Sequence, residues 1–193
     1  MKNYLLIALL LLGTASNAIA QNEDAGKQSI DTIKDFSEFK VLDSKYIDNV
    51  ALWAPFNADL NHFSEATYVA LKPLILEQNI PTLQKNIAQG KLTYEKLVLF
   101  YLYRIRKFDR ENKHSLNAVI ALNPNIVKEA RQKDKEPKPL LGFSVFGMPI
   151  LLKDNINAAG MPTTAGAAAL QENIAEDAFI VKQLKNNGAL ILG

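Results

Sequence analysis

One lysine in the sequence stands where its side chain could act as a base. Lys153 directly follows the apolar run 149–152 and precedes Asp154 and Asn155. An ammonium group that points inward from a buried strand loses hydration, which lowers the pKa of lysine from about 10.4 by up to about 3–5 units. The neutral amine could then accept a proton near pH 7. A lysine at the end of a strand more often reaches water, so the residue alone leaves both roles open.

Strand geometry predicts that the side chains of Lys153 and Asp154 point in opposite directions. Successive side chains point to opposite faces, so Asp154 is a poor ion-pair partner for Lys153, whereas Asn155 shares the lysine's face. We expect Asp154 to orient the backbone at the strand end instead. Thr163 and Thr164 follow in a Pro-Thr-Thr turn. They either line the mouth of the site or bond the local backbone through their hydroxyl groups.

The sequence holds few other catalytic groups. The absence of cysteine excludes a thiol nucleophile and a cysteine-based metal site. His62 and His114 are the only histidines, and neither has a carboxylate at ligand spacing, which argues against a zinc centre and a Ser-His-Asp triad. Ser144 is the last serine and is expected to be an ordinary strand residue.

Helical periodicity predicts the elements that build most of the core. Apolar residues at helical spacing predict helices at 65–75, 82–89, 93–108, 126–133 and 177–187. Thr93 is a plausible N-cap, and Gly90 should end the second helix. The side chains expected to face inward from the last helix are Phe179, Ile180, Val181 and Leu184. From Phe36 to Leu60, mixed signals around Trp53 predict an irregular segment that packs onto the main body.

Short apolar runs predict the strands, at 118–122, 147–152 and 189–192. The last two flank the 177–187 helix, and this order is typical of a right-handed crossover between parallel strands. Parallel strands need cover on both faces. The sequence therefore predicts an α/β fold.

Composition and charge exclude some partners. With 48% hydrophobic and 22% charged residues, the chain has the composition of a soluble globular protein. Its formal charge of +2 is too small to indicate a nucleic acid or an anionic membrane as a partner.

The first twenty residues have the layout of a secretory signal peptide. Lys2 is followed by the apolar run 5–12, and Ala18-Ile19-Ala20 precedes Gln21 as a small-x-small cleavage site. The run is too short to span a bilayer, which needs about 20 residues. We therefore expect export to the periplasm or the medium. The chain is divided into a signal peptide at 1–20, a partly irregular mature extension at 21–63, flexible to about residue 35, and a main domain at 64–193.

Four motifs stand in one order along the second half of the chain. They are Gly147-Met148-Pro149, Lys153-Asp154-Asn155, Pro162-Thr163-Thr164-Ala165-Gly166 and the terminal Gly188-Ala189-Leu190-Ile191-Leu192-Gly193. This ordered set resembles the N-terminal portion of the amidase-signature family. The resemblance covers roughly residues 82–193. It implies the N-terminal part of that fold, with a mixed sheet covered by helices on both faces.

The resemblance also implies a reaction and a role for one residue. Members of this family hydrolyse amides, and sometimes esters, with a Ser-cis-Ser-Lys triad, and Lys153 matches the triad lysine. The resemblance implies no metal and no organic cofactor. Both family serines follow the lysine, whereas no serine follows Ser144 here, so we expect a truncated chain that is inactive alone. The expected ligand of the parent protein is a small-molecule amide, and a homodimer is left open. The alternatives are a non-catalytic binding or subunit module and the amidase subunit of a transamidation complex, which the signal peptide disfavours.

Overall fold

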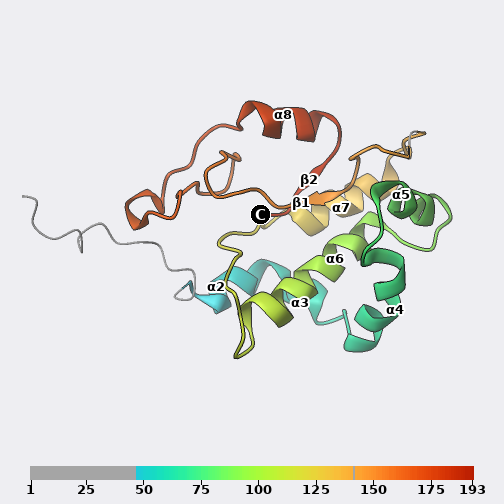
Figure 1. Ribbon diagram of the computed structural model, residues 1–193, viewed down its shortest axis with the longest axis horizontal. Helices are drawn as coiled ribbons and strands as arrows, with labels where there is room; N and C mark the ends of the chain where they lie inside the picture. Colours follow the sequence, from blue (N-terminus) through green and yellow to red (C-terminus); the bar gives the residue numbers. More distant parts are fainter. Residues whose placement is uncertain (1–46, 141) are drawn as a thin grey trace, which may run out of the picture. The chain divides into compact units, whose positions relative to one another are not determined.

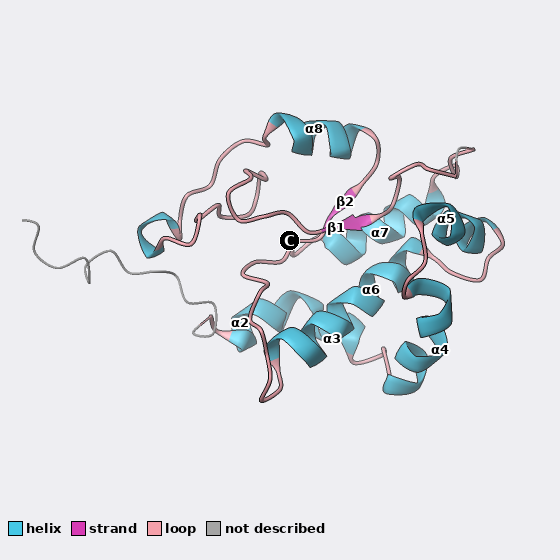
Figure 2. Cartoon of the chain, viewed as in Figure 1, coloured by secondary structure: helices cyan, strands magenta, loops and turns pink. Residues whose placement is uncertain are grey.

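The computed structural model describes residues 47–140 and 142–193. The predicted signal peptide and the predicted flexible segment at 21–35 lie outside these residues. In chain order the elements are α2 (Asn49–Trp53), η3 (Ala54–Phe56), α3 (Asn57–Leu60), α4 (Glu65–Ile75), α5 (Ile80–Ala88), α6 (Tyr94–Ile105), the π-helical turn η4 (Arg106–Arg110), α7 (Ile126–Lys135), β1 (Pro149–Ile150), η5 (Ala168–Leu170), α8 (Phe179–Asn186) and β2 (Leu190–Ile191). A series of helices thus precedes a strand–helix–strand unit (Figure 2).

Three short helices replace the irregular structure expected between residues 49 and 60. Asp48 begins the first of them, because its carboxylate accepts a hydrogen bond from the Val50 N–H at 2.8 Å. Trp53 and Phe56 are 2% and 1% exposed, and their rings meet edge to face with centroids 6.2 Å apart. The segment packs into the main core, as expected, although its backbone is helical.

Side-chain caps set the starts of the longer helices. Ser64 Oγ accepts a hydrogen bond from the Thr67 N–H at 3.1 Å, and Thr93 Oγ1 accepts one from the Lys96 N–H at 3.0 Å. Both helix starts were predicted. The α5 helix begins before the predicted residue 82, because the Asn79 side chain caps it.

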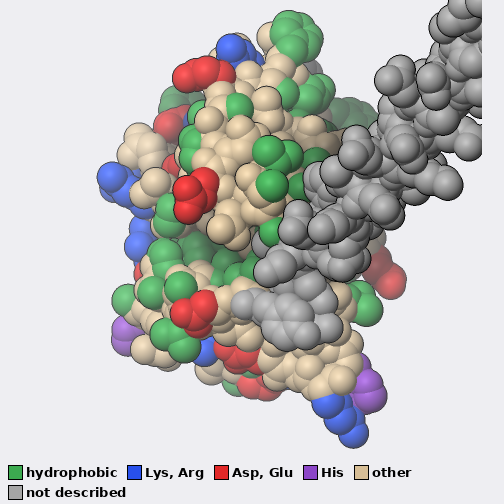
Figure 3. All heavy atoms as spheres, turned by 90° about the vertical axis from the view of Figure 1, so that its left-hand side faces the viewer, with side chains coloured by type: hydrophobic (Ala, Val, Ile, Leu, Met, Phe, Trp, Pro, Cys, Tyr) green, Lys and Arg blue, Asp and Glu red, His purple; other side chains and the backbone are tan. Residues whose placement is uncertain are grey.

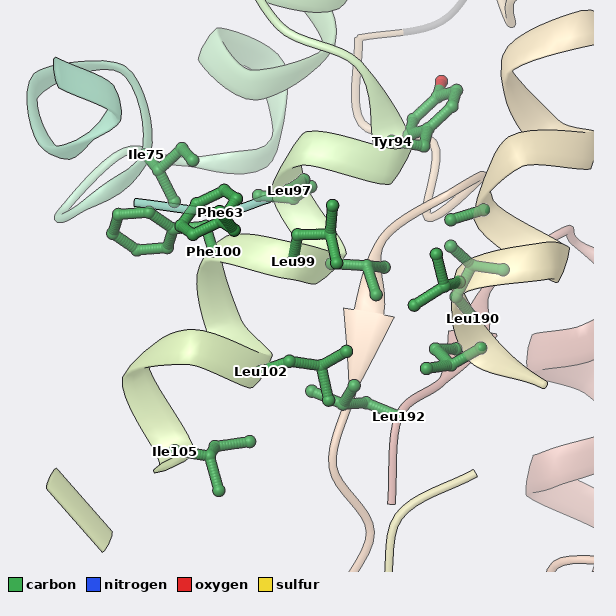
Figure 4. Close-up of a cluster of buried hydrophobic side chains, with 14 of the residues drawn as sticks. Phe63, Ile75, Tyr94, Leu97, Leu99, Phe100, Leu102, Ile105, Leu190 and Leu192 are labelled. Atoms are coloured by element: carbon green, nitrogen blue, oxygen red, sulfur yellow. The ribbon is translucent and has the colours of Figure 1, made fainter. Parts of the chain in front are cut away.

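The α6 helix lies at the centre of the larger hydrophobic cluster. Leu97, Phe100 and Leu102 are completely buried. Figure 4 shows Leu102 directed toward Leu192, with Phe100 on the other side of the helix beside Ile75. The helix therefore joins the α4 region to the sheet.

The two strands of the sheet are parallel, as predicted. Pro149 pairs with Leu190 and Ile150 with Ile191. Hydrogen bonds continue past the assigned strands, from the Gly147 N–H to the Gly188 carbonyl at 2.8 Å and from the Leu152 N–H to the Gly193 carbonyl at 2.9 Å. The ladder thus covers most of the predicted strand 147–152.

Helices cover both faces of these strands (Figure 1). Leu190 and Leu192 belong to the larger cluster with α6 and α7, whereas Ile191 packs with Val181 of α8 in a second cluster. This alternation follows from the two-residue period of a strand. The α/β class is therefore confirmed, and its described sheet consists of two parallel strands.

Two expectations about this region were wrong. Residues 118–122 form no strand, because the amides of Ala118 and Val119 are bonded by the Asp109 carboxylate instead of a neighbouring strand. Phe179 and Ile180 are 78% and 52% exposed. Only one face of α8 contacts the short sheet. Val181 and Leu184 are three residues apart, so they lie on that face, whereas Phe179 and Ile180 do not.

Candidate active site

Lys153 lies at the point where the β1 ladder ends. Leu152 makes the last ladder hydrogen bond, and a turn follows in which the Ile156 N–H donates to the Lys153 carbonyl at 2.9 Å. The Lys153 side chain is exposed, so the inward-pointing lysine considered from the sequence is not observed. Among residues 47–140 and 142–193, no carboxylate forms an ion pair with its ammonium group.

The backbone around Lys153 borders a cavity of about 330 Å³. Its walls are formed by residues 118–121, 151–154, Ile156, Ala158, 161–163 and Gly193. Most of these side chains are apolar, and the polar ones are Lys153, Asp154 and Thr163. The cavity can therefore hold a largely apolar group beside one free amine.

Asp154 fixes the turn that carries the two threonines. Its carboxylate accepts hydrogen bonds from the Thr164 N–H at 2.8 Å, the Gly166 N–H at 3.2 Å and the Thr164 hydroxyl. Its backbone carbonyl accepts the Ala165 N–H at 2.7 Å. Ala165 and Gly166 both have positive φ, at 49° and 78°, so three successive amides can converge on one residue. The expected role of Asp154 in orienting backbone is confirmed.

The two threonines differ in their surroundings. Thr164 is 1% exposed, and its hydroxyl is held by Asp154 and the Gly166 N–H, so it serves the turn. Thr163 is 8% exposed and lines the cavity. Its backbone bonds Asn173, while its hydroxyl has no hydrogen-bond partner in the described part of the chain. Thr163 is therefore the threonine available to a ligand.

The remaining predicted residues lie apart from the cavity walls. Asn155 is exposed in the turn after Lys153 and is not among the lining residues. Ser144 Oγ accepts the Phe146 N–H at 3.2 Å, and its carbonyl accepts Gln84 Nε2 at 2.9 Å. Ser144 thus has a local structural role. His62 and His114 are exposed.

Sequence reasoning missed the wall opposite Lys153. Residues 118–121 line the same cavity as residues 151–154, and Asn123 fixes them to the end of the sheet, with its N–H donating to the Leu192 carbonyl at 2.9 Å. No spacing in the sequence signals this contact. The proximity of Asn117-Ala118 to the preceding Asp109 was the available clue, because an aspartate can bond backbone amides close to it in the chain.

An exposed apolar residue lies beside the cavity wall. Figure 3 views the left-hand side of Figure 1 and shows hydrophobic side chains scattered over the described part of that face among polar ones. Ile174, 59% exposed, lies beside the cavity residue Pro162 through an isolated antiparallel bridge. In the described ranges, no cluster of three or more histidine, aspartate or glutamate side chains could hold a metal ion. No helix of those ranges is long and apolar enough to cross a membrane.

Lys153 follows the partly buried parallel strand β1 in an α/β unit whose two faces are both packed. Residues 96–193 match the sequence profile of the amidase family, and the chain belongs to that family. A probable amidase from Arabidopsis thaliana is 36% identical over 128 residues, which cover 62% of this chain and 23% of the plant protein. A glutamyl-tRNA(Gln) amidotransferase subunit from Exiguobacterium sibiricum is 31% identical over 124 residues, covering 62% of this chain and 24% of that subunit.

Solved structures agree with this assignment. An amidase family protein from Bacillus anthracis superposes with a TM-score of 0.68 and 35% identity, covering 80% of this chain and 30% of that protein. The peptide amidase from Stenotrophomonas maltophilia gives a TM-score of 0.55 and 42% identity, over 61% of this chain and 24% of that enzyme. The chain thus spans about a quarter of the length of these relatives.

Proposed function

We propose that the protein is an amidase that hydrolyses the C–N bond of a carboxylic amide through a Ser-cis-Ser-Lys triad, with Lys153 as the lysine. The observation that carries this proposal is the amine of Lys153, which has no ion-pair partner among the described residues and stands at a largely apolar cavity. The order of the surrounding motifs and the family membership support it.

In the proposed reaction Lys153 first accepts a proton and later donates it. Its neutral amine accepts the proton of the nucleophilic serine through the bridging serine, while the serine oxygen attacks the amide carbon. Backbone N–H groups hold the oxyanion that forms. The ammonium then returns the proton to the leaving nitrogen as the C–N bond breaks, and water hydrolyses the acyl-serine ester. The product pair is an acid and an amine or ammonia.

The chain by itself is proposed to be inactive, because no serine follows Lys153 in the 193 residues. A chimera can test the role of Lys153 even if the isolated chain is inactive. In the peptide amidase from Stenotrophomonas maltophilia, the matched quarter would be replaced by the corresponding segment of this chain. Ammonia release from a peptide amide should appear in the chimera and be absent from the isolated chain. A correctly folded chimera without hydrolysis would refute the proposal.

A second candidate is a subunit that supplies ammonia for transamidation. The amidotransferase subunits among the relatives favour it. The test replaces the matched quarter of the Exiguobacterium sibiricum subunit by the corresponding segment of this chain and measures glutamine-dependent ammonia release by this chimera mixed with the partner subunits of that relative. Ammonia release together with stable complex formation would favour this role. A module that binds the partners without any hydrolysis would instead match the non-catalytic alternative.

Export is a separate proposal that rests on residues 1–20. Expression in a bacterial host, followed by cell fractionation and intact mass measurement, should give an exported chain that begins at Gln21. A cytosolic chain that still begins at Met1 would contradict export and favour the transamidation role.

The exposed apolar residues Ile174 and Phe179 support a homodimer, which light scattering of the purified chain would detect as twice the chain's mass. The small formal charge of +2 supports the absence of a nucleic-acid partner.

A further inference from the structure

The cavity wall at 118–121 is held by side chains from the π-helical turn η4. The Asp109 carboxylate accepts the Ala118 N–H at 2.9 Å and the Val119 N–H at 3.0 Å. The Asp109 carbonyl accepts the Asn117 N–H at 3.0 Å. Asn117 has a φ of 53°, which turns three successive amides toward one residue. The start of the wall therefore depends on Asp109.

Arg110 binds the same wall and a second segment. It is 5% exposed, and its Nη1 donates to the Val119 carbonyl at 3.4 Å. Its Nε donates to Asn49 Oδ1 at 3.0 Å, and its Nη2 to the Ile47 carbonyl at 3.3 Å. The guanidinium thus ties the wall to the residues at the start of α2.

The far end of the wall is fixed by the sheet. Asn123 donates through its N–H to the Leu192 carbonyl at 2.9 Å and through Nδ2 to the Ile191 carbonyl at 3.1 Å. Between these two anchors, Ile120 and Ala121 line the cavity. A π-helical turn is rare and is frequently found at functional sites. Here the turn contains two consecutive residues, Asp109 and Arg110, whose side chains both bond the backbone at the start of the wall.

We infer that Asp109 and Arg110 are positioning residues that set the wall 118–121 opposite Lys153 and so determine the shape of the cavity. The nature of the ligand rests on the proposed function, whereas the position of the wall does not. Asp109 acts through backbone amides and Arg110 through the Val119 carbonyl. Neither residue is among those that line the cavity.

The chain offers a matched control for Asp109. The Asp134 carboxylate also accepts two backbone amides, the Tyr94 N–H at 2.8 Å and the Glu95 N–H at 3.0 Å, and it is not a cavity-lining residue. Asp109→Asn and Asp134→Asn therefore remove the same kind of contact at two places. Asp109→Glu, which keeps the carboxylate, tests for partial rescue.

The experiment follows the methyl resonances of Ile120 and Ile156 and the exchange of the bonded amides of Ala118, Val119 and Asn123 in the 193-residue chain by NMR, with benzamide as the probe. Asp109→Asn should shift both methyl resonances, speed exchange about tenfold and weaken benzamide binding at least fivefold. Asp134→Asn should leave all three unchanged, and Asp109→Glu should restore part of the loss.

The methyl resonances of the unliganded chain decide the inference even if benzamide does not bind, and that result would count against the proposed ligand alone. If Asp109→Asn does not fold, Asn49→Ala, which removes the acceptor of Arg110 Nε, should shift the Ile120 methyl resonance from its wild-type position. Unchanged Ile120 and Ile156 resonances in the folded variants would overturn the inference. Equal changes in Asp134→Asn would also overturn it.

Discussion

Replacing Asp154 by asparagine should destabilise the chain by about 2–4 kcal/mol, because a hydrogen bond to a charged group contributes about 1.5–3 kcal/mol. The carboxylate accepts three donors, from the Thr164 N–H, the Thr164 hydroxyl and the Gly166 N–H. Asparagine keeps one oxygen, which can retain the Thr164 N–H. Its NH₂ group would face the Gly166 N–H, and because both groups are donors, no hydrogen bond can form between them.

The loss is measured by urea and thermal unfolding of the 193-residue chain, with amide exchange at 164–166 as the local readout. The expected fall in Tm is about 5–15 °C, taking about 2–4 °C per kcal/mol for a chain of this size. Asp48→Asn is the control, because asparagine caps a helix about as well as aspartate and α2 should be unaffected. An Asp154→Asn variant within about 0.5 kcal/mol of wild type would refute the role of the carboxylate.

Three further changes have expected outcomes. Gly147→Ala should lower the free energy of unfolding by at least about 1–3 kcal/mol in urea titrations, because φ is 70° and the new Cβ would overlap the Tyr94 ring. Tyr94→Phe should cost about 1–3 kcal/mol, since it leaves the buried Gln84 Oε1 without its donor at 2.8 Å; an unchanged urea midpoint would contradict this. Burial raises the pKa of Asp177, but its hydrogen bonds with Lys185 and the Ala159 amide outweigh burial and hold the pKa below its ordinary 3.8. This contribution to stability is present above pH 3.8 and lost as pH falls below it, so the difference in unfolding free energy between wild type and Asp177→Asn should shrink between pH 5 and pH 2.

The parts of the fold that depend on local chemistry could be predicted from the sequence. Ser64 and Thr93 cap helices through amides three residues away, so their environment is contained in a short segment. The parallel pairing of 147–152 with 189–192 followed from two apolar runs around an amphipathic helix. The exposure of Phe179 and Ile180 could not be predicted, because it depends on how narrow a surface the sheet offers to α8.

The candidate site was predicted only in part. Lys153 was identified through the order of motifs, and its exposure differs from the buried lysine that strand periodicity allowed. Asp154 was predicted to orient backbone at the strand end, and its carboxylate has that role. The opposite wall at 118–121 was missed because its position depends on Asp109 and Asn123, which bond it through contacts that no period encodes.

The central claim is that Lys153 is the base of an amidase. It is tested most directly by kcat/KM for peptide-amide hydrolysis in the chimera with the peptide amidase, comparing Lys153→Met with Lys182→Met, a change at an exposed lysine of α8. Loss of general-base catalysis predicts a fall of about 10²–10⁴-fold for Lys153→Met. The Lys182→Met chimera should keep the parent rate. A Lys153→Met chimera that hydrolyses the amide as fast as its parent would contradict the account.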